Sequence, residues 1–401
     1  MVEYLNETTL FEGIYLRRIR EGGTPYWIPD PKHYAKPGYY LPFELPLFYN
    51  PMMELNRDLS VIALATYLNI TDSDPEDITY IELLAGTGIR GFRVLNEVGA
   101  INVIMNDLNP QCVRFMHFNA RFFPPEIQSH ATILNYEANH LLNSIRLWRK
   151  KVDAIDIDPF GTPTPFIDSA IRTLRKKRGL LLLTATDTSA LIGKFPQSAR
   201  RKYGVYTFAT PFGGEVAVRT LIYYTLNVAT KYGLALRPLF GFFFMHFIKI
   251  AFITIPGRKV ADRFLWEETG WIEIQEKGTR ILKTLQGKIE NKVIGPLWLG
   301  PIYDKEFIGE ALKTLSKLPL SDKTRKKLEL WFQAEIETAF IPFYYNVELI
   351  ASKLRKTTPK IKEVINELQR LGYIAERTHF HPKAIKTNAP PKVLEEVIKK
   401  L

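Results

Sequence analysis

The chain has 401 residues, of which 46% are hydrophobic and 24% charged, a globular composition that excludes a mainly disordered chain. A single hydrophobic core rarely exceeds about 300 residues, so this length predicts at least two domains. The formal net charge of +12 favours polyanionic partners, nucleic acids above all, although many basic proteins are merely soluble.

The N-terminal segment, residues 1–46, is rich in Tyr, Pro and Gly and contains short alternating runs such as GIYLRRI. We therefore expect a β-rich extension there. Early acidic residues and the lack of an apolar core argue against a secretory signal. Cys112 is the only cysteine, which excludes an intrachain disulfide and a cysteine-based zinc cluster. These features predict a cytoplasmic protein.

From residue 47 to residue 256, short apolar runs alternate with segments of helical periodicity. The expected elements, in chain order, are a helix over 55–68, a strand over 79–85, a helix through 94, a strand over 101–107, a helix over 110–122, a strand over 130–138, a polar helix, a strand over 152–158, a helix over 165–176, a strand over 179–186, a helix over 215–231 and an antiparallel hairpin over 236–255. This alternation predicts βαβ crossovers and a mostly parallel, seven-stranded sheet with helices on both faces. The apolar run over 238–256 contains His246 and Lys249, so paired strands are expected there and no membrane span.

The composition changes after Pro256, where IPGRKVADRF is basic and turn-like, and we place a domain boundary there. Short strands around 266–274 and a loop over 295–304 are expected next, followed by helical periodicity from residue 305. Two helices, over 347–354 and 359–371, have helix-turn-helix spacing, and the residues after them can form the strands of a wing. The sequence thus predicts an α+β C-terminal domain over 257–401 with a winged-helix-like unit at about 340–390.

A glycine turn follows the first strand of the predicted sheet, in the order Ala85, Gly86, Thr87, Gly88. Glycine lets a backbone turn tightly and approach a ligand, but many such turns need glycine for steric reasons only. Asp107 ends the next strand, about 20 residues further on, where a carboxylate can accept hydrogen bonds from both ribose hydroxyls. An acid before Pro110 is equally typical of a helix cap.

The third strand is followed by Glu137 and Ala138, which are placed to meet an adenine amino group. The carboxyl ends of successive parallel strands form the crevice in which open α/β sheets bind nucleotides. Three such groups describe an adenosine site, and S-adenosylmethionine is the obvious cofactor.

The fourth strand runs into DIDPFG, and this segment predicts the chemistry. Asp158 can accept an N–H bond and a proton from the exocyclic amine of a base, while Pro159 stiffens the turn and Phe160 offers a face for stacking. Asp156 points the same way as Asp158 if the strand persists and can orient the cofactor or the helix around Arg57. A plain β-turn is the alternative, since Asp, Pro and Gly all favour turns; with the upstream acids, methyl transfer is the better interpretation.

Eight segments resemble, in order, the tRNA guanine-26 N2-dimethyltransferase family: LFYNPMMELNRD (47–58), AGTGIRGFR (85–93), MNDLNP (105–110), YEANHL (136–141), DIDPFGTPTPFIDSA (156–170), LTATDTSAL (183–191), GPLWLGPI (295–302) and THFHPKAIKTNAP (378–390). The resemblance implies a Rossmann-like class I methyltransferase domain over 47–256 and S-adenosylmethionine as donor. It also implies transfer of one or two methyl groups to N2 of a guanine in tRNA. By the same resemblance, Asp158 is catalytic, and the cofactor is held by Arg57, Arg90, Asp107, Glu137 and Ala138.

The chain departs from the family pattern at several places near the expected base pocket. Glu82 and Glu137 stand where Asp is usual, with the charge kept, and Glu82 is expected at the cofactor. The segments over 191–204 and 212–220 lack the usual Cys and His. Mono- or dimethylation, another RNA or DNA target, and a tRNA-binding protein with little catalysis therefore stay open.

Methylation of a base in a tRNA helix junction requires the nucleotide to be extruded, while the flanking RNA is held by shape and phosphate. A basic run is usually a solvated helix face, but several in a chain of net +12 favour phosphate contact. The expected RNA contacts are Arg175, Lys176, Lys177, Arg200, Arg201, Lys202, Arg377, His379, Lys383 and Lys386. Two histidines at 379 and 381 without further ligands predict hydrogen bonding, so no metal is expected. We expect a monomer with tRNA as its partner.

Overall fold

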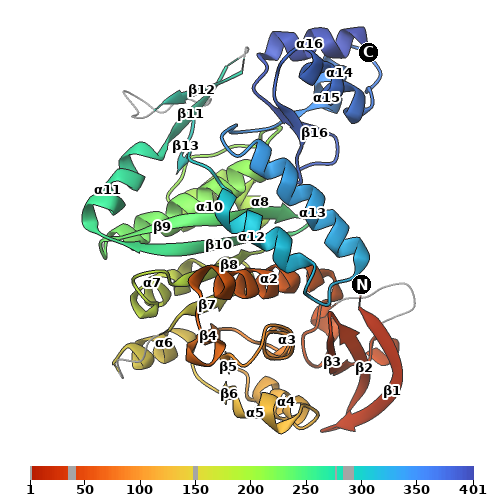
Figure 1. Ribbon diagram of the computed structural model, residues 1–401, viewed down its shortest axis with the longest axis vertical. Coiled ribbons are helices and arrows are strands. Elements are labelled where there is room, and N and C mark those ends of the chain that lie inside the picture. The colour runs from red at the N-terminus through yellow and green to blue at the C-terminus, as the bar shows by residue number, and fades with distance from the viewer. Residues whose placement is uncertain (1, 35–41, 148–151, 276–277, 283–292) are drawn as a thin grey trace. The chain divides into compact units, whose positions relative to one another are not determined.

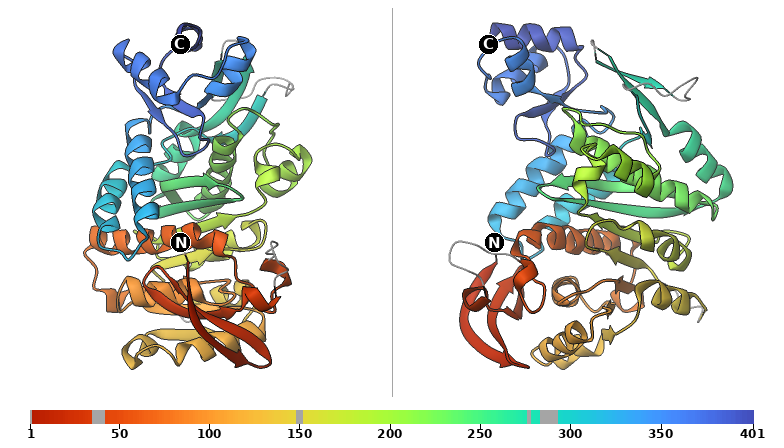
Figure 2. Two further views of the ribbon diagram at one scale, coloured as in Figure 1. Left: turned by 90° about the vertical axis from the view of Figure 1, so that its right-hand side faces the viewer. Right: turned by 180° about the vertical axis from the view of Figure 1, so that it is seen from behind.

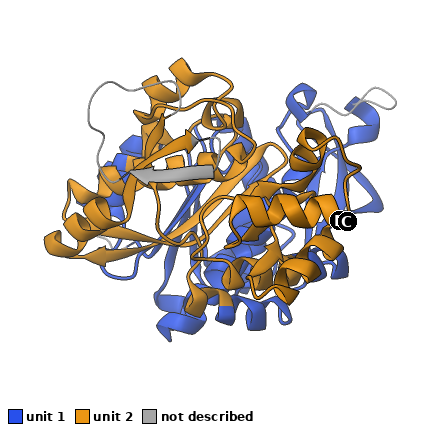
Figure 3. Ribbon diagram, turned by 90° about the horizontal axis from the view of Figure 1, so that it is seen from above, with its two compact units in different colours: residues 1–159, 168–183, 309–327 blue, residues 160–167, 184–308, 328–401 orange. Residues whose placement is uncertain are grey.

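The computed structural model describes residues 2–34, 42–147, 152–275, 278–282 and 293–401. The chain divides into two compact units, coloured separately in Figure 3. Unit 1 comprises Met1–Pro159, Asp168–Leu183 and Gly309–Lys327, and unit 2 comprises Phe160–Ile167, Thr184–Ile308 and Leu328–Leu401.

The N-terminal strands of unit 1, red in Figures 1 and 2, form an antiparallel sheet in the order β1-β2-β3. They are β1 (Glu3–Phe11), β2 (Ile14–Glu21) and β3 (Thr24–Pro29), and the short helix α1 (Pro31–Tyr34) follows. Four residues of β2 are buried, namely Ile14, Leu16, Ile19 and Glu21. The main chain of Trp27 donates to Asn119 Oδ1 at 2.9 Å, which fixes β3 against α4 (Pro110–Ala120).

Within the described ranges, seven strands form the central sheet in the order β6-β5-β4-β7-β8-β10-β9. They are β4 (Thr79–Glu82), β5 (Asn102–Asn106), β6 (Ala131–Leu134), β7 (Ala154–Ile157), β8 (Leu180–Ala185), β9 (Leu234–Phe244) and β10 (Phe247–Pro256). Pairing is parallel from β6 to β8, and β9 and β10 form an antiparallel hairpin. The predicted mostly parallel, seven-stranded sheet is confirmed, and its parallel strands are shorter than expected.

Helices connect the parallel strands, as the periodicity predicted (Figure 1). The connecting helices are α3 (Ile89–Glu97), α4, α5 (Pro125–Ser129), α6 (Ala138–Leu147) and α7 (Thr164–Thr173). Before the first of these strands lie α2 (Glu54–Thr71) and 3-10 turns at Pro42–Glu44, Pro51–Met53 and Pro75–Asp77. All four residues of β7 are buried, and one of them is Asp156. A carboxylate inside an otherwise apolar strand needs partners, and these define the site described below.

Unit 2 continues with α8 (Thr188–Leu191), α9 (Pro196–Tyr203) and α10 (Gly213–Thr230). The expectation of a turn-like segment after Pro256 is wrong, because α11 (Arg258–Glu267) occupies it. Ala261 and Phe264 are buried at helical spacing, and the basic residues that suggested a turn occupy the other face.

The second difference in unit 2 concerns residues 295–304, which were expected as a loop. Residues 295–298 belong to β13 (Val293–Trp298), an outer strand in the sheet order β12-β11-β13, where a proline is tolerated. Its partners are β11 (Thr269–Gln275) and β12 (Gly278–Leu282). The strand expected from residue 266 begins at Thr269, because residue 266 belongs to α11.

The remaining elements are α12 (Lys305–Leu315), α13 (Asp322–Glu337), β14 (Tyr345–Asn346), α14 (Val347–Lys353), α15 (Ile361–Arg370), β15 (Ala375–Arg377), β16 (Ala384–Thr387) and α16 (Pro391–Lys400). Residues such as Val347, Val364, Leu368 and Leu394 form a separate core for the C-terminal elements, blue in Figure 2. The two helices expected over 347–354 and 359–371 are confirmed as α14 and α15, and β15 and β16 follow them. Their assignment as a winged helix stays a prediction. None of the helices in the described part of the chain has the length and hydrophobicity needed to cross a membrane.

Candidate active site

The glycine turn joins β4 to α3, and its two glycines serve different purposes. Both have positive φ, +54° at Gly86 and +82° at Gly88, a region that glycine enters at little cost. A Cβ on Gly88 would lie 2.6 Å from Met116 Cγ, whereas a Cβ on Gly86 would have no atom within 4 Å. Gly88 is therefore needed for packing, while Gly86 leaves open space where a ligand can approach the backbone.

Gly91 completes a G-x-G-x-x-G spacing with Gly86 and Gly88. A Cβ on Gly91 would lie 2.5 Å from the Met105 side chain and 2.9 Å from Glu82 Oε2, so this glycine allows α3 to pack closely on β4 and β5. The same spacing occurs in dinucleotide sites. The glycine spacing therefore does not distinguish S-adenosylmethionine from a dinucleotide.

Asp107 follows β5 and connects directly to the glycine turn. Its Oδ2 accepts a hydrogen bond from the Gly86 main-chain N at 2.7 Å, and its Oδ1 accepts one from Asn109 N at 2.9 Å. Asn109, rather than Asp107, is the N-cap of α4. The structure thus brings Asp107 and Gly86 together, as the prediction of a shared ligand site requires.

Asn106 ties three loops together at the carboxyl edge of the sheet, a role that sequence reasoning missed. Its Nδ2 donates to Leu83 O at 3.1 Å and to Tyr136 O at 3.0 Å, and its Oδ1 accepts from Tyr136 N at 3.0 Å. The loops after β4, β5 and β6 are therefore fixed relative to one another. The only signal in the sequence was a polar residue at the end of an apolar strand.

Glu137 lies three residues beyond the end of β6 and is exposed. Its carboxylate accepts from Asn139 N at 3.0 Å and from His140 N at 2.7 Å, which caps α6. Ala138, the first residue of α6, is buried. Because a carboxylate has about four acceptor positions, the cap leaves capacity for a further donor.

Arg90 in the first turn of α3 gathers the acids of β4 and β7. Its guanidinium donates to Glu82 Oε1 at 3.3 Å, to Asp156 Oδ2 at 3.1 Å and to Asp158 Oδ2. Ser60 of α2 donates to the same Asp156 oxygen at 2.6 Å and accepts from Arg90 at 2.7 Å. Asp156 and Asp158 thus point the same way, as the sequence predicted, and Ser60 is a member that sequence reasoning missed.

The electrostatic balance of this cluster is set by three acids around one arginine. Burial, with Asp156 and Asp158 nearby, raises the pKa of Glu82 to about 8, although Arg90 and a hydrogen bond from Gly91 N oppose the shift. The raised pKa favours the protonated form of Glu82 in the folded protein at neutral pH. With Glu82 neutral, the positive charge of Arg90 faces the carboxylates of Asp156 and Asp158.

Asp158, Pro159 and Phe160 differ sharply in exposure. The Asp158 side chain retains 18% of its accessible surface, against 0% for that of Asp156. Pro159 is buried, and Phe160 is 70% exposed, an unusual state for an aromatic residue. In this segment Asp158 is the acid that a substrate can reach, and Phe160 presents a ring to solvent.

Arg57 belongs to a second buried network. It donates to both carboxylate oxygens of Glu21, at 2.5 and 2.6 Å, and Arg93 donates to Glu21 at 3.1 Å. Burial opposes ionisation of Glu21, but Arg57 and Arg93 lower its pKa to about 2. The structure thus places Arg57 against the tip of β2, and its contact with the cofactor stays a prediction from the family resemblance.

The basic residues expected at RNA fall into an exposed and a buried group. Lys176 and Lys177 in unit 1, and Arg200, Arg201, Arg377 and Lys383 in unit 2, are exposed, while Arg175 and Lys202 are half-buried. Arg175 pairs with Asp153 at 2.7 Å, Lys202 with Asp187 at 2.9 Å, and Lys383 with Glu348.

His379 and Lys386 are buried, so the prediction that they contact RNA is wrong for this structure. His379 Nδ1 lies 2.9 Å from Glu335 Oε1, and Lys386 Nζ donates to Glu335 Oε2 at 3.0 Å. Burial lowers the pKa of His379, while Lys386 and hydrogen bonds hold the pKa of Glu335 well below its usual value despite burial. These side chains stabilise the interior of unit 2. Among the described residues, no group of three or more His, Cys, Asp or Glu side chains could hold a metal ion.

Comparisons with known proteins agree with this geometry. A family model described as "N2,N2-dimethylguanosine tRNA methyltransferase" matches residues 30–399. Proteins named tRNA (guanine(26)-N(2))-dimethyltransferase from Methanocaldococcus jannaschii and Methanopyrus kandleri are each 35% identical, over 95% and 96% of this chain and 98% and 96% of their own lengths. The solved structure of Trm1 from Pyrococcus horikoshii with S-adenosyl-L-methionine has a TM-score of 0.79 and 27% identity, covering 95% of this chain and 99% of that chain.

Proposed function

Because the chain belongs to the N2,N2-dimethylguanosine tRNA methyltransferase family, we propose that it transfers methyl groups from S-adenosylmethionine to N2 of guanine 26 in tRNA. The observation that supports this most strongly is the pair of carboxylates Asp156, in β7, and Asp158, directly after it. Both accept hydrogen bonds from Arg90, which lies on the helix that follows the glycine turn. The chain spans nearly the full length of relatives that bear this activity in their names.

The residues at the glycine turn fit an adenosine-containing donor. The open space above Gly86 admits a ligand to the backbone, and Asp107 beside it can accept hydrogen bonds from ribose hydroxyls. Glu137 and the main chain at Ala138 are proposed to meet the adenine. Arg57 and Arg90 are proposed, from the family resemblance, to bind the donor. When bound, the donor supplies an electrophilic methyl group on a sulfonium.

The chain's own contribution to chemistry is the handling of the amine proton. The lone pair of guanine N2 is delocalised into the ring, so the amine becomes a better nucleophile when a base accepts a proton from it. We assign this role to Asp158, which is partly exposed, whereas the buried Asp156 and Arg90 orient it. Phe160, with its exposed ring, is proposed to stack on the extruded base, and Pro159 to keep that ring in place.

The exposed basic residues are proposed to hold the RNA. Arg200 stacks over Tyr206 with 4.7 Å between its guanidinium carbon and the ring centroid, and Lys202 pairs with Asp187, so α9 presents an ordered basic face. Lys176, Lys177, Arg201, Arg377 and Lys383, with the half-buried Arg175, are proposed as further phosphate contacts. We expect the enzyme to act as a monomer in the cytoplasm.

The function is tested by nucleoside mass spectrometry of a tRNA transcript incubated with enzyme and donor. We expect N2-methylguanosine and N2,N2-dimethylguanosine, both lost when guanine 26 is replaced by adenine. Methylated guanine that survives this replacement would identify another position, and label entering duplex DNA instead would identify another substrate. Binding of tRNA without any methylated nucleoside would favour a binding protein.

A further inference from the structure

A cavity of about 360 Å³ lies entirely within unit 2 and contains none of the residues proposed to bind the methyl donor. It is bordered by α11, by β13 and the loop after it, by Arg237 and Pro238 of β9, and by the residues that follow α13. Its volume is within the range of small-molecule sites, about 300 to 1,000 Å³. The segment GPLWLGPI, to which the proposed methyl transfer gives no role, supplies Trp298 and Pro301 to its wall.

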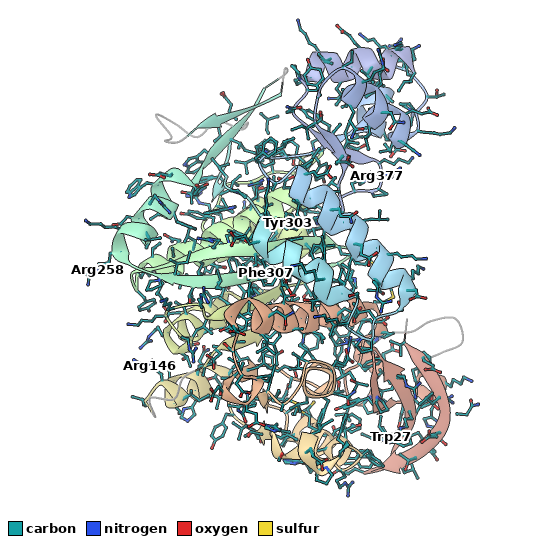
Figure 4. The ribbon with its side chains drawn as sticks, viewed as in Figure 1. Trp27, Arg146, Arg258, Tyr303, Phe307 and Arg377 are labelled. Carbon is teal, nitrogen blue, oxygen red and sulfur yellow. The ribbon has the colours of Figure 1, made fainter. Side chains whose placement is uncertain are left out.

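The wall of the cavity is aromatic. Phe264 of α11 and Trp298 of β13 are buried, with ring centroids 5.9 Å apart. Phe340, just after α13, is 57% exposed although it lines the same cavity. Tyr303, labelled in Figure 4, closes one side and donates its hydroxyl to Gly241 O at 2.7 Å. Such surfaces stack on unpaired nucleobases.

A carboxylate lies beside the indole inside this aromatic wall. A Cβ on Gly300 would lie 2.4 Å from Glu268 Oε2 and 2.6 Å from Trp298 Cζ2, so the glycine makes room for both side chains. Within the described part of the chain, the half-buried Glu268 carboxylate has no hydrogen-bond or ion-pair partner. The acceptor positions of this carboxylate are therefore available to a ligand that supplies N–H groups.

The chemistry of the carboxylate selects among the bases, because it only accepts hydrogen bonds. Guanine presents two adjacent donors, N1–H and the N2 amino group, on its Watson–Crick edge. Adenine and cytosine place an acceptor beside their amino group, which would face the carboxylate oxygen. At the rim, Arg237, with its side chain 50% exposed and 3.5 Å from Asp304, and the exposed Lys305 are suited to a phosphate.

We propose that this cavity binds an unstacked guanine nucleotide of the RNA substrate at a position other than the methylated one. Glu268 accepts from the Watson–Crick edge, the ring stacks on the aromatic wall, and Arg237 and Lys305 contact the phosphate. This inference rests on the proposed function, because it takes the ligand from tRNA. It gives the GPLWLGPI segment a role in substrate recognition.

The first test measures the affinity of full-length variants for a tRNA transcript. Phe340→Ala and Glu268→Gln should each raise the Kd at least about fivefold, the lower end of what one stacked base contributes. Trp266→Ala and Glu306→Gln are matched controls, since both residues are exposed and neither lines the cavity. The controls should bind within twofold of wild type, and affinity for the methyl donor should be unchanged in all four variants.

The second test locates the base with tRNA that contains photoreactive 6-thioguanosine. Crosslinks should fall in peptides that contain Trp298 or Phe340 and should be lost in Glu268→Gln; crosslinks only elsewhere would overturn the inference.

Guanosine monophosphate serves as a separate probe: if its binding depends on Glu268 while tRNA affinity does not, the site serves free nucleotides and the RNA assignment is wrong. Wild-type enzyme that methylates tRNA, with cavity variants that bind it normally, would refute this inference alone. Wild type that neither binds nor methylates tRNA would refute the proposed function.

Discussion

Replacement of Asp158 by asparagine separates its proposed role as proton acceptor from its role in the ionic cluster. The asparagine amide oxygen can still accept the hydrogen bond from Arg90, and Asp156 still faces the same guanidinium at 3.1 Å. The shape of the site is therefore kept. What is lost is a group that can take up a proton at neutral pH.

The expected magnitudes follow from this geometry. Loss of general base catalysis costs at least about a hundredfold in rate, which corresponds to about 2.7 kcal/mol in activation free energy. The Asp158 side chain is partly exposed, and Arg90 retains Asp156, so we expect only about 1 kcal/mol of lost stability. Donor affinity should change less than threefold, because Asp158 is not among the residues proposed to bind the donor.

The assay is single-turnover methylation of tRNA, with donor binding and thermal unfolding measured on the same preparation. Asp168→Asn is the matched control, since this carboxylate on α7 is 48% exposed and pairs with Arg172 at 3.6 Å. It should keep the wild-type rate. A normal single-turnover rate in Asp158→Asn would refute the reasoning, and so would a rate loss fully explained by weaker donor binding.

Three further predictions concern the surroundings of the site. Because the pKa of Glu82 is about 8 in the folded protein and near 4.5 when unfolded, the folded state holds a proton that the unfolded chain releases, so stability falls between about pH 4.5 and pH 8. Glu82→Gln should remove that part of the fall, on the order of 3 kcal/mol in denaturant titrations at several pH values; an identical pH profile would contradict it. Gly86→Ala should raise the Kd for the donor at least tenfold in calorimetry, since its methyl enters the open space, whereas Gly372→Ala, also at positive φ with no atom within 4 Å, should leave the Kd unchanged. Lys386→Met should cost about 3 to 5 kcal/mol in chemical denaturation, because Glu335 and Glu215 lose their ammonium partner, while Lys383→Met at the surface should cost less than about 1 kcal/mol.

The sequence predicted the parts of the site that lie on one strand or one turn. Asp156 and Asp158 had to share a side because strand residues alternate, and Gly86 had to mark the turn after β4. What it could not give were partners from distant segments. Ser60, 96 residues before Asp156, donates to it, and Asn106 joins three loops. No local pattern encodes such contacts.

The errors share a physical cause as well. Residues 258–267 were expected to form a turn because they are rich in basic residues. The helical spacing of the buried Ala261 and Phe264 was not recognised. His379 and Lys386 were assigned to RNA because charge was equated with exposure. In the structure the carboxylate of Glu335, on a helix some 50 residues earlier, compensates both side chains inside unit 2. A charged residue can be predicted to lie at the surface only where no buried partner of opposite charge compensates it.

The central claim is that the carboxyl ends of β4, β5 and β6 bind the donor on the side that Asp158 faces. A crystal structure with S-adenosylhomocysteine tests it most directly. We predict ribose hydroxyls within hydrogen-bond distance of Asp107, adenine next to Glu137 and Ala138, and the sulfur on the Asp158 side of the Gly86 turn. Ribose bound away from Asp107, or sulfur on the opposite side from Asp158, would contradict the account.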